Sequence, residues 1–133
     1  MILGFKKKIN GKPTNFPEKI LSFSKKHTIR EDKPNRWKQG RMIQFVTRGK
    51  SFSCEKFAEM PCLGIQKIEI KHNVPRFNGN LGLMVYVDGF ALSDSQVYEL
   101  SKNDGFDDIV DFLAWFNKDF EGKIIHWTNH VRY

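Results

Sequence analysis

Apolar and polar residues alternate with the period of a β-strand in several short segments of the chain. In "GIQKIEIKH" (64–72), Ile68 and Ile70 alternate with charged neighbours, which predicts a strand with one face in water. "LGLMVYVDGF" (81–90) is apolar on both faces, as in a more central strand. β-branched and aromatic residues predict further strands in "HTIR" (27–30), "RMIQFVT" (41–47) and "KIIHWTNHVRY" (123–133).

Three segments have helical spacing instead. In "TNFPEKILSFSKK" (14–26), Asn15 is a candidate cap and Glu18 the partner in a capping box, and the helix is expected to end near Ser24. Ser93 and Gln96 predict the start of a second helix. In "FDDIVDFLAWFNKDF" (106–120), the expected apolar stripe consists of Ile109, Leu113, Phe116 and Phe120.

The order of these elements is not a regular βαβ alternation and indicates an α+β fold with a curled sheet or small barrel. The 133 residues suffice for one domain, and no linker or repeat divides them. We therefore expect a single domain over residues 1–133.

Composition excludes several classes of protein. The two cysteines, Cys54 and Cys62, lack zinc-ligand spacing and indicate neither a metal site nor a disulfide scaffold. No nucleotide-fold or common hydrolase motif occurs, so we expect no cofactor and no metal. No segment has the length of a membrane span or the form of a signal peptide, and we expect a cytoplasmic protein with no membrane partner.

Positive charge is concentrated in the first part of the chain. Residues 1–50 contain 14 Lys or Arg against 3 Asp or Glu, a net charge of +11, which leaves −4 for the rest of a chain with +7 in total. Such a basic face attracts polyanions. The candidate nucleic-acid contacts are five cations and a ring that could stack on an unpaired base: Lys25, Lys26, Arg30, Arg36, Lys38 and Trp37. A merely solvated surface is the alternative.

Lys25 and Thr28 also form a candidate catalytic pair. A lysine whose pKa is lowered by burial or by neighbouring cations can remove the proton of a hydroxyl and make it nucleophilic. Asp104, before Gly105, is the candidate acid that holds the lysine or protonates a leaving amine. The four histidines are dispersed, and His126 and His130 are interpreted as surface or partly buried side chains.

The segments "ILSFSKKHTIRED" with "RWKQG", and "DGFDDIVDFLAWF" further on, resemble the ASCH domain family over about residues 16–128. The resemblance implies a PUA-like small β-barrel of five to six strands with flanking helices, which binds RNA in a basic cleft. Some members of the family are amidohydrolases that deacetylate acetylcytidine with a Lys, a Thr and a Glu. Lys25 and Thr28 match the first two, and Asp104 stands at or near the third as a shorter acid.

Three hypotheses about function follow. The first is a protein that binds RNA or another nucleic acid in a basic cleft. The second is an amidohydrolase that acts on an acylated nucleoside through Lys25, Thr28 and Asp104, with Arg30 stabilising negative charge. The third is a protein-interaction module that presents Trp115 and Trp127. The choice between RNA, DNA and a free nucleoside stays open, as does the oligomeric state.

Overall fold

A computed structural model describes residues 1–9, 11–48, 54–76, 79–129 and 131–133. The helices are α1 (Phe16–Leu21), α2 (Asp94–Asn103) and α3 (Ile109–Trp115). The strands are β1 (Ile2–Lys6), β2 (Lys8–Ile9), β3 (Lys12–Pro13), β4 (His27–Arg30), β5 (Met42–Arg48), β6 (Cys54–Pro61), β7 (Gly64–Pro75), β8 (Leu81–Val87), β9 (Phe90–Ala91) and β10 (Phe120–His126).

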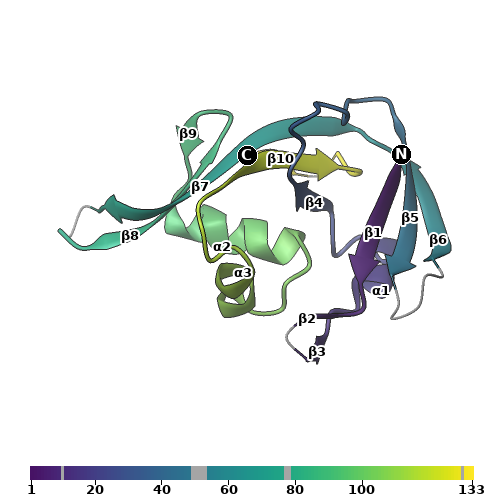
Figure 1. The fold of residues 1–133 in the computed structure, drawn as a ribbon, viewed down its shortest axis with the longest axis horizontal. Coiled ribbons are helices and arrows are strands. Elements are labelled where there is room, and N and C mark those ends of the chain that lie inside the picture. The colour runs from purple at the N-terminus through teal and green to yellow at the C-terminus, as the bar shows by residue number, and fades with distance from the viewer. Residues whose placement is uncertain (10, 49–53, 77–78, 130) are drawn as a thin grey trace.

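The strands form two main sheets and a small hairpin. The larger sheet has the order β4-β10-β7-β8-β9, and the smaller one has the order β1-β5-β6. β1 runs parallel to β5, whereas the other neighbouring strands are antiparallel. In Figure 1, α2 and α3 lie together on one side of the long β7-β8 pair, and α1 lies beside the smaller sheet.

Two hydrophobic cores meet at β10. The helix core lies between the larger sheet and α2 and α3, and the β1 core lies between β1, α1 and β5. The buried members of the helix core are Ile29, Ile68, Ile70, Val85, Val87, Leu92, Val97, Leu100, Phe112, Phe116 and Ile124. Those of the β1 core are Leu3, Phe5, Phe16, Ile20, Trp37, Ile43, Phe45, Cys62, Ile125 and Trp127. Ile124 and Ile125 are neighbours in β10 and enter different cores because successive side chains of a strand point to opposite faces.

The α+β class is confirmed, but the described sheets do not close into a barrel. The predicted strands at 27–30, 41–47, 64–72 and 81–90 all correspond to strands of the structure. The last predicted strand is shifted, because β10 begins at Phe120 and ends at His126. Sequence analysis missed β1 and β6, which flank β5 in the smaller sheet.

The helices differ from expectation at their ends. α1 stops at Leu21, and Asn15 has a left-handed backbone (φ 53°) without a side-chain cap, so the capping box predicted there is wrong. The capping box of Ser93 and Gln96 is present. Of the predicted stripe, Phe116 is buried and Ile109 and Phe120 pack against the helix core. Leu113 is 36% exposed, and Phe112 is the fully buried residue in its place, so only this member of the stripe was wrong. None of the helices described is long and apolar enough to cross a membrane.

Candidate active site

Lys25 lies between α1 and β4 and is almost completely buried, with 1% of its surface exposed. Its Nζ donates to the backbone oxygen of Asp104 and lies 3.5 Å from Asp104 Oδ1. The Nζ also lies 4.6 Å from the centre of the Phe16 ring and 5.7 Å from that of Phe5. A buried ammonium needs such partners, because an unpaired charge is costly in a low-dielectric interior.

Burial changes the protonation of this lysine. The pKa of Lys25 is lowered from 10.5 to about 8, because desolvation and, to a smaller extent, the charge of Arg30 outweigh the opposing charge of Asp104. A minor fraction of the side chain is therefore neutral near pH 7, and a neutral amine can accept a proton.

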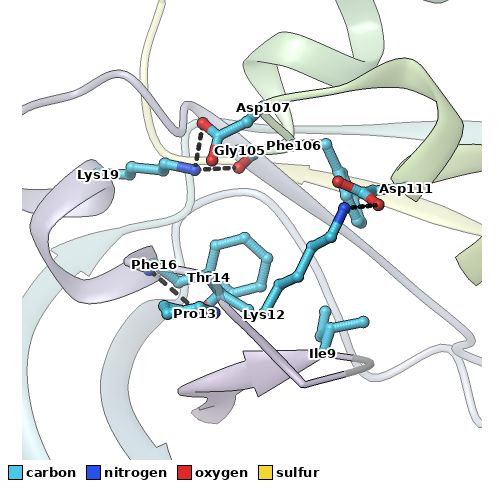
Figure 2. A pocket seen from close by; sticks show the side chains of 10 residues that line it. All are labelled: Ile9, Lys12, Pro13, Thr14, Phe16, Lys19, Gly105, Phe106, Asp107 and Asp111. Carbon is cyan, nitrogen blue, oxygen red and sulfur yellow. Dashed lines mark hydrogen bonds and ion pairs between the residues drawn. The ribbon is translucent and has the colours of Figure 1, made fainter.

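Gly105 makes room for Lys25. Its φ is +95°, which a side chain would strain, and a Cβ at this position would lie 3.0 Å from Lys25 Cδ and 3.1 Å from Phe16 Cε1. Lys19 holds the same turn from α1, because its Nζ donates to Gly105 O at 2.7 Å and to Asp107 Oδ1 at 2.9 Å. Figure 2 shows these two bonds beside a small cavity between the β2-β3 hairpin, α1 and the Gly105 turn. Lys12 of the hairpin lies 3.4 Å from Asp111 Oδ1.

Asp104 belongs to a buried chain of polar groups. Its Oδ1 lies 3.1 Å from His27 Nδ1, and His27 Nε2 lies 2.7 Å from the hydroxyl of Tyr133. Asn103 Nδ2 donates to that hydroxyl at 3.1 Å. Since a carboxylate only accepts, His27 donates from Nδ1 and accepts the Tyr133 proton at Nε2. Burial lowers the pKa of His27, which fits this neutral tautomer.

Thr28 and Arg30 lie on one face of β4, two residues apart. Arg30 Nε donates to Thr28 Oγ1 at 3.3 Å, and its Nη2 donates to Gly4 O of β1 at 2.7 Å. The guanidinium carbon also lies 5.0 Å from the centre of the Phe5 ring. Arg30 is therefore held against β1 with a donor pointing at the threonine hydroxyl.

One cavity of about 190 Å³, the lysine cavity, brings the three catalytic candidates together. Its wall contains Lys25, Thr28 and Asp104 with Arg30, and five aromatic rings. The complete lining is Gly4, Phe5, Lys6, Ile9, Phe16, Lys25, Thr28, Ile29, Arg30, Asp104, Phe106, Trp115 and Phe116. A largely apolar hollow with a few convergent polar groups is the usual form of a small-molecule site.

The predicted nucleic-acid contacts are not all brought together. Lys25 and Arg30 line the lysine cavity, and Arg30 and Arg36 line a more open cavity beside β1. Lys26 and Lys38 belong to the wall of neither. Trp37 is only 5% exposed within the β1 core, so the exposed stacking ring predicted there is wrong. Its backbone N–H, with that of Arg36, donates to the Asp32 carboxylate, which turns the loop and its ring inward.

Two other sequence interpretations change. His126 is fully buried, donates from Nε2 to Gln66 Oε1 at 2.9 Å, and has its pKa lowered to about 3 by burial. His130 lies outside the described residues. Trp127 is buried, whereas Trp115 is 44% exposed, so the pair does not form an exposed aromatic surface. Among the described residues, no group of three or more His, Cys, Asp or Glu could hold a metal ion.

Sequence reasoning missed the contribution of β1 and of His27 and Tyr133. His27 begins β4 beside the polar Lys26 and Thr28, so local pattern gave no signal for its burial, and its partners are 77 and 106 residues away. No protein-family model matches the chain, and searches of curated proteins and of solved structures return no significant match.

Proposed function

We propose that this chain is a small amidohydrolase of the ASCH domain family, related to PUA-like proteins, which removes the acyl group from an acylated nucleoside in the lysine cavity. The observation that carries the proposal is the buried Lys25, with a pKa of about 8, in the same wall as Thr28, Arg30 and Asp104. A lysine kept only for solubility would lie in water instead. The aromatic lining favours a planar ring as the carrier of the acyl group.

The proposed reaction assigns one step to each of these groups, which line the same cavity. Neutral Lys25 accepts the hydroxyl proton of Thr28 while Oγ1 bonds to the acyl carbon. Arg30, whose Nε lies 3.3 Å from that oxygen, stabilises the oxyanion that forms. When the carbon–nitrogen bond breaks, the Lys25 ammonium returns its proton to the leaving nitrogen. Water, with Lys25 again as base, then releases the carboxylic acid and restores the hydroxyl.

Asp104 has a different part in this proposal from the one first expected. The sequence suggested an acid that protonates the leaving amine, but its carboxylate accepts from both Lys25 and His27. We therefore assign it the task of orienting the lysine. The shorter side chain suits this role, because the backbone oxygen of Asp104 also accepts from Lys25.

The test is hydrolysis of acetylated nucleosides by purified protein, followed by separation of the products. Thr28→Val should abolish release of the acyl group while ligand affinity is largely kept. Thr128→Val is the matched control, since Thr128 is equally buried, lies outside the cavity wall, and its Oγ1 has no hydrogen-bond partner among the described residues. Full activity of Thr28→Val would refute the proposed nucleophile.

RNA binding is a second candidate, supported by the net charge of +11 in residues 1–50 and by the exposed Arg36 and Lys38. Affinity of this kind falls steeply with salt. Single-stranded RNA binding at low salt should survive Thr28→Val and weaken in Arg30→Glu. If neither hydrolysis nor RNA binding is found, the protein-interaction hypothesis remains.

A further inference from the structure

The more open cavity beside β1, here the arginine cavity, continues the lysine cavity along the same strand. It is lined by the first half of β1 and by the segment after β4, and its members are Met1, Ile2, Leu3, Gly4, Arg30, Glu31, Arg36, Trp37 and Gln44. The lysine cavity begins at the shared residues Gly4 and Arg30 and continues along Phe5 and Lys6. Gly4 and Arg30 thus line both hollows.

The length of the combined site exceeds what an acyl group requires. At roughly 3.3 Å per residue, the strand from Ile2 to Lys6 spans about 13 Å. The reacting groups Lys25 and Thr28 line only the inner part. A substrate whose acyl end reaches Thr28 therefore has the rest of its length beside Arg30 and the outer cavity.

The charges of the two walls favour an anion in that outer part. The outer cavity is lined by Arg30 and Arg36 against the carboxylate of Glu31. The inner cavity is lined by Lys6, Arg30 and Lys25, the last of which is neutral when it acts as a base, against Asp104. Each carboxylate lies near a lysine: Asp104 Oδ1 is 3.5 Å from Lys25, and Glu31 Oε1 is 3.1 Å from Lys33. Arginine is the side chain best suited to phosphate because its fork of donors matches the phosphate oxygens.

Arg36 has no part in the proposed hydrolysis, yet its position is well defined. Its N–H donates to Asp32 at 2.9 Å, and its backbone oxygen accepts from Arg41 Nη1 at 2.9 Å. The backbone is thus fixed from both sides while the side chain is exposed at the cavity wall. Because the loop backbone is already fixed, Arg36 can bind a ligand without the entropic cost of ordering the loop.

We infer that the substrate carries a phosphate, which Arg36 binds together with Arg30 in the arginine cavity while the acylated base occupies the lysine cavity. The inference rests on the proposed function and narrows its substrate to an acylated nucleotide. A free nucleotide and a nucleotide within RNA present the same phosphate chemistry, and the experiment separates them.

The experiment compares kcat/KM for an acetylated nucleoside, its 5′-monophosphate and a short single-stranded RNA with the same acetylated base, at low salt. We expect the phosphorylated compound to be preferred about tenfold, as one charge-assisted contact allows. Arg36→Ala should remove this preference, and Lys38→Ala, two residues away and outside both cavities, should keep it. A higher kcat/KM for the monophosphate than for the nucleoside identifies a free nucleotide as the substrate. A higher kcat/KM for the RNA alone identifies a nucleotide within RNA as the substrate.

The variant should fold, because the contacts fixed at position 36 come from its backbone. Equal kcat/KM for nucleoside and both phosphorylated compounds, or equal loss of preference in Arg36→Ala and Lys38→Ala, would overturn the inference. If no compound is hydrolysed, the proposed function fails, but calorimetric titration with the unacetylated nucleoside and its monophosphate still decides the subsite. Phosphate-dependent affinity that requires Arg36 would support it, and affinity without this dependence would reject it.

Discussion

At the scale of single residues, the lowered pKa of Lys25 determines when the proposed base is active. Lys25 must be neutral to accept a proton, so kcat should rise with pH and level off above about 8. Asp104 raises this pKa through its charge, and Asp104→Asn should therefore move the midpoint of the profile to lower pH. The measurement is kcat from pH 6 to 10 for both proteins, with Asp107→Asn as a charge-matched control. A midpoint that does not move, or moves upward, would contradict the arrangement.

The two buried histidines of neighbouring strands make folding sensitive to acid. Burial lowers the pKa of both His27 and His126, the second to about 3, so the unfolded chain binds more protons below about pH 6.5. Stability should then fall as pH decreases below 6.5, by about 1.4 kcal/mol per pH unit through His126, and His27 should add to the fall in the same direction. Urea unfolding at several pH values measures this slope. His126→Gln should reduce this slope by about 1.4 kcal/mol per pH unit, which corresponds to one proton. Lys67→Gln, at an exposed position of β7, should leave the slope unchanged.

The residues of the candidate site show what could be predicted from the sequence and what could not. Lys25 and Thr28 were found because they are close in the chain and match two positions of a family pattern, and Asp104 was found because it stands at or near the third position as a shorter acid. Their grouping in one cavity agrees with that expectation. His27 was missed and Trp37 was misjudged because their burial depends on distant partners, Tyr133 for the first and the β1 core for the second. Local pattern contains no information on such contacts.

At the scale of elements, β1 is the part that local pattern could not identify. It has only five residues, includes a glycine, and is followed by lysines, so its strand character arises from parallel pairing with β5 some forty residues later. β6 was missed because it is a charged edge strand that ends in proline. By contrast, β4 and the capping box of α2 could be predicted, because each depends only on residues that are close together in the chain.

β1 contributes to stability mainly through Phe5. This ring is 2% exposed, stacks on Phe45 with 5.8 Å between ring centres, and meets Trp127 edge to face. Phe5→Ala should lower the free energy of unfolding by about 3–5 kcal/mol, the range for a buried phenylalanine. Ile2→Ala in the same strand is the control, because Ile2 is 62% exposed. Denaturant titration measures the free energy of unfolding of both variants. Similar losses in Phe5→Ala and Ile2→Ala would argue against the packing described for β1.

At the scale of the whole molecule, the two cores depend on one strand. Ile124 enters the helix core and Ile125 enters the β1 core. Unfolding of β10 would therefore disrupt both cores at once. Unfolding should therefore be a single transition. Two of the three tryptophans, Trp37 and Trp127, lie in the β1 core and report on it through fluorescence. Far-UV circular dichroism includes α2 and α3, which pack against the other core.

We expect the two signals to coincide in urea titrations of the natural chain. Ile125→Ala should move both midpoints together, because a cavity of this kind costs about 2–5 kcal/mol and the transition is shared. The exposed-residue variant Leu81→Ala, at the far end of β8, is the control. If fluorescence changes at lower urea than circular dichroism, the cores unfold separately and the shared-strand argument is wrong.

The close approach of Lys25 and Phe16 to Gly105 has a consequence for other sequences. Lys25, Thr28 and Asp104 can all be present in a chain that has alanine at position 105, and the added methyl group would then press on the lysine stem and on Phe16. Such a chain would contain the three candidate catalytic residues, but the lysine would not fit into the position in which the structure holds it. A homologue should therefore be considered equivalent only if it also lacks a side chain at this turn.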